Sequence, residues 1–268
     1  MVKELSRIKL EDVQAVYSGS EGDLWELIMG HQIHIGGFKS SMDLAEKANI
    51  GKGMTGVDLC SCNGAGVRFL LRFRDVSFMY GVDATEQVVE RANQRTAIEG
   101  FANRTKFILG DVTDIDLPDT VVDFVWGEDA WCYVVDKNKL ISEAARLVKS
   151  GGTIAFTDWI EGPVPMTSEE ADRFLSFMKF PNIQDLQGYT DLLNANGCEV
   201  LIAENTGRYA PCIDLYLQML DMQLTSDALR IIGYDMELFQ ALAGEMMFIQ
   251  QLAHADKVIQ GLFVARKK

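Results

Sequence analysis

One stretch, residues 55–66 with the sequence TGVDLCSCNGAG, most constrains the fold of this chain. An apolar run typical of a buried strand breaks into a turn of small residues, and a helical pattern follows at residues 67–73. A strand, turn and helix of this kind let the backbone approach a ligand closely, because small side chains leave room and the helix N–H groups point at the ligand. Alone, the pattern is weak, so its meaning depends on the strands that follow.

Successive predicted strands end in polar or small residues. The segment FMYGVDA ends in Asp83, KFILGDV contains Asp111, and VDFVWGED contains Glu128. An acidic residue roughly 20 positions beyond such a turn is where a ribose-binding group is expected. Strands alternate with helical patterns, which requires right-handed crossovers. The sequence therefore predicts an α/β, Rossmann-like, mainly parallel sheet of seven strands with helices on both faces.

Hydrophobic periodicity predicts the individual elements. The predicted strands are 56–59, 78–82, 106–109, 121–126, 153–157, 199–203 and 260–265. The predicted helices are 42–49, 67–73, 85–99, 139–147, 171–178, 183–195 and a long region within 212–255. Residues 17–22 read as a loop, and Gly151-Gly152 as a stop before the fifth strand. We expect a single domain over 1–268, with an N-terminal lid (1–48), a cofactor-binding core (50–160) and helical cap insertions (161–183 and 205–256).

Composition narrows the class of partner. The chain has 268 residues, 48% of them hydrophobic, which is enough to bury a full core. Its formal net charge of −14 argues against nucleic acid or an anionic membrane as a partner and mildly favours cationic ligands. The main reason for this charge is expected to be a solvated acidic surface. Neither a leader-like segment nor an apolar run of spanning length is evident, so the expected location is the cytoplasm.

Cysteine and histidine spacing predicts no metal site. Five cysteines form an odd set without repeated paired spacing, so we interpret them as reduced thiols, with Cys60 and Cys62 as small residues of the turn. His31 and His34 are three residues apart, but no third ligand follows at a matching spacing. His34, next to two glycines, is either a loop residue that faces a ligand or a hydrogen-bonded structural histidine, and both interpretations stay open.

At this point the motifs carry a family resemblance. The segments GVDLCSCNGAG, GVDATEQVVERA, FILGDVTDIDLP, VDFVWGEDAWCYVVD and EAARLVKSGGTIAFTDW resemble class I S-adenosylmethionine-dependent methyltransferases over residues 50–160. The segment IMGHQIHIGGF is similar to the W-G-G-E-D-I-H-x-G-x-Y segment of sarcosine/dimethylglycine N-methyltransferases. Those enzymes also carry D-A-F-L-H where this chain has DAWCY at 129–133. The family turn reads D-L-G-x-G-x-G, and here cysteines replace its first two glycines.

The resemblance implies S-adenosylmethionine as cofactor and assigns its contacts. The turn lies against the methionine part, Asp83 holds the ribose, Asp111 frames the adenine, and the Glu128 carbonyl accepts from the ammonium. The full set of cofactor residues is Tyr17, Asp58, Cys60, Cys62, Gly64, Gly66, Asp83, Ala84, Asp111, Val112 and Glu128. A cysteine forced to φ > 0 in the turn would cost roughly 1 kcal/mol or more.

The expected acceptor is a small molecule, most simply an amine. His34 and Tyr133 are the candidate catalytic groups, and His31, Trp131 and Trp159 the candidate substrate contacts. The tryptophans near the ends of two strands either hold a methylated cation or pack under the cap. Three alternatives stay open: O- or C-methylation of a small metabolite, a nicotinamide dehydrogenase, and a non-catalytic protein that binds an adenosyl ligand or a partner. The sequence predicts no oligomeric state.

Overall fold

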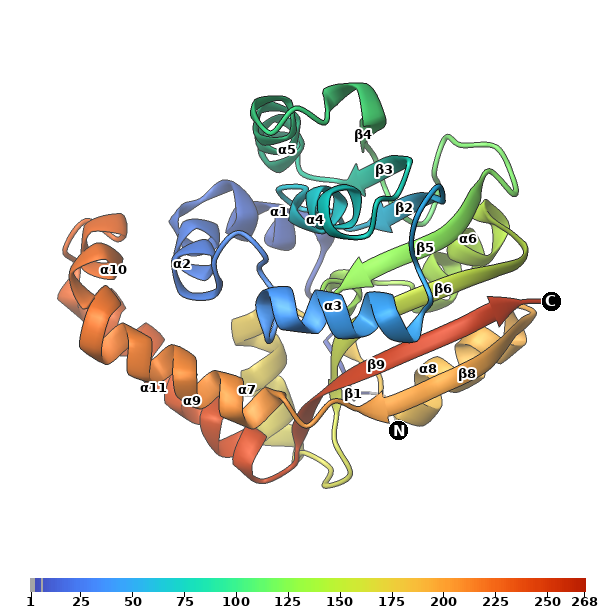
Figure 1. Ribbon diagram of the computed structural model, residues 1–268. Helices are drawn as coiled ribbons and strands as arrows, with labels where there is room; N and C mark the ends of the chain where they lie inside the picture. Colours follow the sequence, from blue (N-terminus) through green and yellow to red (C-terminus); the bar gives the residue numbers. More distant parts are fainter. Residues whose placement is uncertain (1–2, 6) are drawn as a thin grey trace.

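A seven-stranded sheet forms the centre of the computed structural model, which describes residues 3–5 and 7–268 (Figure 1). Its strand order is β4-β3-β2-β5-β6-β9-β8. Neighbours are parallel except β9, which runs antiparallel to both β6 and β8. The strands are β2 (Thr55–Leu59), β3 (Phe78–Asp83), β4 (Thr105–Leu109), β5 (Val122–Glu128), β6 (Val148–Glu161), β8 (Cys198–Asn205) and β9 (Val258–Lys267). The predicted Rossmann-like sheet is thus confirmed.

Helices cover both faces of this sheet because its strands alternate apolar side chains between the two faces. In β5, Phe124 and Trp126 pack with buried residues of α3 and α4, whereas Val125 packs with α6 and α8. The helix α5 lies against β3 and β4 at the edge (Figure 1). The bounds are α3 (Gly37–Lys47), α4 (Ala65–Phe73), α5 (Glu86–Ile98), η1 (Ala102–Arg104), η2 (Trp131–Tyr133), α6 (Lys137–Leu147) and α8 (Leu186–Ala195).

A third apolar cluster lies beyond the carboxyl ends of the strands, where residues such as Trp25, Phe174, Ile213 and Met246 pack together. Its helices are α1 (Leu10–Ser18), α2 (Ser20–Met29), α7 (Ser168–Met178), α9 (Tyr209–Met219), the π-helical turn η3 (Leu220–Leu224) and α11 (Met236–His254). The helix α10 (Thr225–Ile231) follows η3. The short strand β1 (Lys3–Glu4) pairs with β7 (Asn182–Ile183). The division into lid, core and caps stays a prediction, and residues 1, 2 and 6 of the predicted lid lie outside the described residues.

Two predicted boundaries are wrong. Residues 17–22 are not a loop, because α1 and α2 follow one another with a break only at Gly19. Gly22 serves close packing: a Cβ there would lie 3.0 Å from the Tyr17 Cα. Gly151-Gly152 lies within β6 instead of before it. The long region within 212–255 divides into α9, η3, α10 and α11. Among the described residues, none of the helices combines the length and apolar character needed to cross a bilayer.

Candidate functional site

Three carboxylates meet at the carboxyl edge of the sheet. The chain proceeds from β2 outward to β4 and then returns to place β5 on the other side of β2, so the sheet order reverses there. Open α/β sheets bind ligands at such a point. Asp58 is in register with Gly81 of β3 and Trp126 of β5, and Asp83 and Glu128 each lie two residues beyond these partners. Because side chains alternate with a period of two, all three carboxylates share one face.

The electrostatics of this edge favour a cation. Burial raises the pKa of Asp58 well above its ordinary value, and the nearby Glu128 and Asp83 raise it further. Burial also raises the pKa of Asp83, against the opposing effect of N–H donors from Thr85 and Cys62. Carboxylates that repel one another in a buried site gain free energy when a positive group lies between them. The site is therefore suited to an ammonium or a comparable cation.

The turn after β2 adopts the left-handed conformation at three alternating positions. The φ angles are 63° at Cys60, 45° at Cys62 and 75° at Gly64. At Gly64 a side chain is excluded, since a Cβ would lie 2.7 Å from the Phe107 ring. The turn is held by the Cys62 N–H, which donates to Asp83 Oδ2 at 2.9 Å. Both cysteines thus adopt φ > 0, the conformation in which a cysteine is expected to cost roughly 1 kcal/mol or more.

We expect Cys62→Gly to be more stable than Cys62→Ala by roughly 1 kcal/mol, because only glycine adopts φ > 0 without steric cost. Both variants lose the same thiol, so their comparison isolates the backbone. Chemical denaturation measures the difference in free energy of unfolding. The same comparison applies at Cys60. Equal stability of the alanine and glycine variants would show that the turn is not strained.

A cradle beside Gly66 has polar walls. A Cβ added to Gly66 would lie 2.8 Å from Asp58 Oδ2, 3.1 Å from Glu128 Oε2 and 3.3 Å from Trp126 Nε1. The Trp126 Nε1 atom is buried and has no hydrogen-bond partner among the described residues. Glycine at this position keeps open a space bounded by two carboxylates and one N–H donor. The dimensions and the donor set suit the polar end of a zwitterionic ligand.

The loop between α2 and α3 is held over the site by contacts distant in sequence. The Ile35 N–H donates to Asp129 Oδ2 at 2.7 Å. The Gln260 amide donates to both Asp129 oxygens, at 3.0 and 2.9 Å, and to the Ile35 carbonyl at 3.2 Å. The Gly36 N–H donates to the Tyr216 hydroxyl at 3.1 Å. One buried carboxylate, from the end of β5, therefore fixes the loop that carries His34.

His34 is buried and joined to the carboxylate edge. Its Nε2 lies 3.1 Å from Ser41 Oγ and 3.3 Å from Glu128 Oε1, and the Ser41 hydroxyl donates to the same Glu128 oxygen at 2.7 Å. Its Nδ1 is buried without a hydrogen-bond partner among the described residues. The Glu128 side chain thus contacts both His34 and Ser41. The role of its backbone carbonyl, which the resemblance implies, stays a prediction.

Two tyrosines close the other side of the pocket. The Tyr17 hydroxyl donates to the Tyr133 hydroxyl at 2.9 Å, and the two rings meet edge to face. Burial raises the pKa of both phenols well above the ordinary value of 10.0. Tyr133 therefore stays neutral at physiological pH and acts as a hydrogen-bonding group, not as a base.

One pocket brings most predicted site residues together. Those that line it are Tyr17, His31, His34, Asp58, Cys60, Cys62, Gly66, Asp83, Ala84, Asp111, Val112, Glu128 and Tyr133. Gly64, Trp131 and Trp159 do not line it. Gly64 packs against Phe107, whose ring occupies the space that a side chain at position 64 would need.

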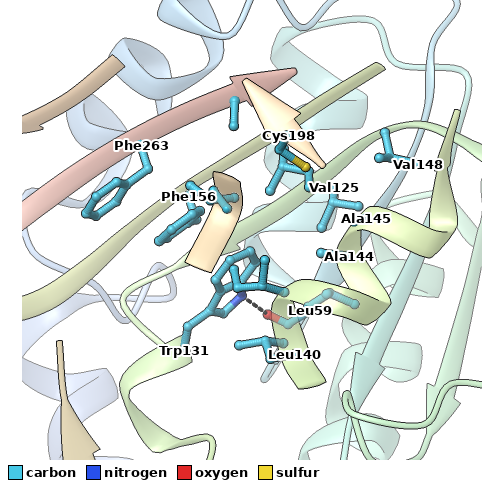
Figure 2. Close-up of a cluster of buried hydrophobic side chains, with 14 of the residues drawn as sticks. Leu59, Val125, Trp131, Leu140, Ala144, Ala145, Val148, Phe156, Cys198 and Phe263 are labelled. Carbon is cyan, nitrogen blue, oxygen red and sulfur yellow. Dashed lines mark hydrogen bonds between the residues drawn. The ribbon is translucent and has the colours of Figure 1, made fainter. Parts of the chain in front are cut away.

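The predicted substrate contacts Trp131 and Trp159 are wrong. Trp131 is fully buried, stacks on Phe156 and donates from Nε1 to the Leu59 carbonyl at 3.3 Å (Figure 2). Trp159 is buried in a different cluster, against the ring of Tyr209. Trp126, another tryptophan near these strand ends, packs in the cluster of α3 and α4, so the three rings do not form one group. Trp126 is in register with Ala155 of β6, and Trp159 lies four residues further along that strand, so both point to one face of the sheet. Trp159 lies past the end of β5 and therefore packs in a different cluster from Trp126.

Sequence reasoning missed several polar residues of the site. Ser61 and Asn63 of the turn and Asp129 line the pocket, and Asn63 donates to the His31 carbonyl at 3.1 Å. Ser41 and Gln260 support it from α3 and β9. Gln260 left a detectable signal, a polar residue in the apolar strand VIQGLFVA, whereas nothing in the local sequence distinguishes Ser41.

A buried polar network supports the segment that carries Tyr133. Asp158 accepts from the Cys132 N–H at 3.0 Å and from the Tyr189 hydroxyl at 2.5 Å. Burial raises the pKa of Asp158 from 3.8 to about 6, against the opposing effect of Tyr189 and Lys137. Burial lowers the pKa of Lys137 to about 8, and its ammonium donates to the Cys132 and Val134 carbonyls.

We expect the stabilising contribution of protonated Asp158 to be present below about pH 4 and lost as the pH rises to about 6. The pKa of Asp158 in the folded protein exceeds its ordinary value, so the folded protein binds the proton more tightly than the unfolded chain does. This difference contributes at most about 3 kcal/mol to the free energy of unfolding. Asp158→Asn should remove this fall in the free energy of unfolding between pH 4 and 6, whereas Asp116→Asn, at an exposed position, should not. Denaturation between pH 4 and 6 measures it, and identical slopes in wild type and Asp158→Asn would contradict the assignment. Lys137 titrates above this window.

Residues 57–156 match the family described as methyltransferase domain. The 27-O-demethylrifamycin SV methyltransferase of Amycolatopsis mediterranei is 30% identical over 131 residues, 48% of each chain. The chain spans about half or less of the length of the first four curated relatives that it matches.

Solved structures share the fold over nearly the whole chain. A putative sarcosine dimethylglycine methyltransferase from Galdieria sulphuraria has a TM-score of 0.83 at 20% identity, covering 93% of this chain and 98% of that one. Phosphoethanolamine N-methyltransferase 2 from Haemonchus contortus, solved with S-adenosyl-L-methionine, has a TM-score of 0.84 at 19% identity, covering 94% and 58%. At such low identity these likenesses establish the fold.

Proposed function

We propose that this chain, which carries a class I S-adenosylmethionine-dependent methyltransferase domain, transfers the methyl group of that cofactor to a small amine. When bound, the cofactor supplies an electrophilic methyl group on a sulfonium. The cradle beside Gly66 fits its methionine end: Asp58 and Glu128 would flank the ammonium. Asp83 would hold the ribose hydroxyls, and Asp111 with Val112 would frame the adenine. All these residues line one pocket.

The charge of the pocket lining is the observation that carries the choice of an amine. Its carboxylates are Asp58, Asp83, Asp111, Glu128, Asp129 and Asp136, and the only lysine or arginine among the described lining residues is Lys139. Such a lining attracts a protonated amine and repels carboxylates and phosphates. It therefore favours an amine without an acidic group over sarcosine, dimethylglycine or a phosphorylated amine, although two proteins of similar fold are named for such acceptors.

The protein's own contribution is alignment and removal of one proton. An in-line displacement needs the acceptor lone pair directed at the methyl carbon and water excluded. His34 would accept the ammonium proton of the acceptor at Nδ1, which has no partner among the described residues, while Glu128, 3.3 Å from Nε2, would orient the ring. Tyr133 would orient the acceptor through its hydroxyl, which Tyr17 holds in place.

A screen for methyl transfer tests this function. Purified protein with S-adenosylmethionine is offered matched sets of amines, amino acids, phosphorylated amines, alcohols and thiols, and release of S-adenosylhomocysteine is measured. We expect turnover with amines that lack acidic groups and at least about tenfold lower kcat/KM for acidic counterparts of equal size. Preferred turnover of alcohols would show that the acceptor group is a hydroxyl and not an amine. Cofactor binding without any turnover would contradict enzymatic function.

A further inference from the structure

A second cavity lies among the helices outside the sheet. It has a volume of about 330 Å³ and is enclosed by α2, the end of α7, α9, η3, α10 and α11. Figure 1 shows α10 and α11 extending past α2, on the side away from β8 and β9. Trp25, Ile28 and Met246 form part of its wall and are themselves buried. It shares no described lining residue with the carboxylate pocket.

Two acidic side chains interrupt this apolar lining. Glu21 of α2 is partly buried, and Asp221 of η3 is exposed. Within residues 3–5 and 7–268, neither carboxylate forms an ion pair or accepts a hydrogen bond from another residue. Burial raises the pKa of Glu21, and Lys179 only partly opposes this. No lysine, arginine or histidine is among the described residues that line the cavity. An apolar space with unpaired carboxylates matches a ligand that is both apolar and cationic.

The backbone around Asp221 departs from regular helix. Residues 220–224 form a π-helical turn between α9 and α10, and Leu220 and Asp221 of this turn line the cavity. A π-helical turn gives up part of the regular i→i−4 ladder and is frequent at functional sites. Here the turn carries Asp221, so the irregular backbone and an unpaired carboxylate occur in the same segment of the cavity wall.

We propose that this cavity is a second ligand site, which binds an apolar amine with its hydrocarbon or aromatic body against Trp25 and Met246 and its ammonium beside Glu21. The cavity volume of about 330 Å³ lies at the lower end of the range of small-molecule pockets, roughly 300 to 1,000 Å³, which suits a molecule of the size of a phenylalkylamine. Binding here requires neither the cofactor nor methyl transfer, so the inference goes beyond the proposed function.

Three probe molecules with similar apolar parts and different charges test whether the cavity prefers a cation. Calorimetry of the full chain with 2-phenylethylamine, 2-phenylethanol and 3-phenylpropionate at pH 7 should give tightest binding for the cation and at least about tenfold weaker binding for the anion. Glu21→Gln should weaken amine binding about tenfold and leave the alcohol nearly unchanged. Glu237→Gln, which makes the same change in net charge at an exposed position outside the cavity, should not. Equal affinity for all three probes would overturn the proposal in favour of a neutral apolar ligand.

A second pair of variants tests the location. Ala243 is exposed on α11 and lines the cavity, whereas Ala241 is exposed on the same helix outside it. Ala243→Trp should abolish amine binding, and Ala241→Trp should not. S-adenosylhomocysteine should bind both variants like wild type, so a failure of the cofactor assignment is seen separately. Amine binding that survives Ala243→Trp would overturn the location, and self-association lost in that variant would assign the surface to a second copy instead.

Discussion

Tyr133→Phe and His34→Ala are each expected to lower kcat for methyl transfer by about ten- to a thousandfold, while the Kd for S-adenosylhomocysteine stays near the wild-type value. Phenylalanine keeps the ring that packs on Tyr17 and Phe180 but removes the hydroxyl that accepts the hydrogen bond from Tyr17. Alanine at position 34 removes the imidazole next to Glu128. Initial rates with an acceptor found by the screen, with calorimetry of the cofactor product, separate chemistry from binding.

Two surface variants serve as matched controls for these substitutions. Tyr234 is 64% exposed and lies outside the pocket, so Tyr234→Phe should retain wild-type rates. His254 pairs with Asp214 at the surface, so His254→Ala should also leave turnover unchanged. Wild-type rates in both Tyr133→Phe and His34→Ala would place the acceptor elsewhere and leave only the cofactor assignment. A loss in Tyr133→Phe that Tyr17→Phe partly reproduces would support positioning through the hydroxyl pair.

Asp83→Ala should weaken binding of S-adenosylmethionine at least about tenfold, since a charge-assisted hydrogen bond contributes about 1.5 to 3 kcal/mol. Its oxygens also accept from the Cys62 and Thr85 N–H groups at 2.9 Å, so removal of the carboxylate frees the turn as well. Calorimetry measures the loss. Because burial raises the pKa of Asp83, wild-type affinity should fall as the pH drops and the carboxylate is protonated.

Two further variants make this result interpretable. Asp83→Asn keeps the shape and one acceptor oxygen, so it should fold like wild type even where alanine loosens the turn, and it should still bind the cofactor weakly. Asp116→Ala removes an exposed carboxylate outside the pocket and should bind like wild type. Unchanged affinity in both Asp83 variants would refute the assignment of the ribose contact.

The order of strands and the position of the carboxylates were predictable because both depend on local pattern. Alternating strands and helices permit few topologies, and a residue that ends a parallel strand lies at one known edge. Asp58, Asp83 and Glu128 accordingly lie where the sequence placed them. The acidic lining that supports the choice of an amine needed the structure, because Asp129 and Asp136 join it only through the turn after β5.

What could not be predicted depends on which way a side chain points and on contacts between distant segments. The sequence at the end of β5 does not indicate that the ring of Trp131 turns back into the core. Likewise, no local pattern predicts the contact between Gln260 and Asp129, which lie 131 positions apart. Glycines between residues 17 and 22 suggested a loop, whereas Gly22 permits two helices to approach. Tertiary packing decided each of these cases against local propensity.

The pairing of β1 with β7 also bears on the order in which the molecule assembles. Lys3 lies opposite Ile183, so β1 can pair only after a partner about 180 residues later in the chain has been made. At 5 to 20 residues per second, synthesis alone imposes a delay of roughly ten to forty seconds. Pulsed hydrogen exchange during refolding should likewise show β2 and β5 protected before β1, because contacts of such sequence separation form late. The β1–β7 ladder would then be added to a central sheet that is already formed.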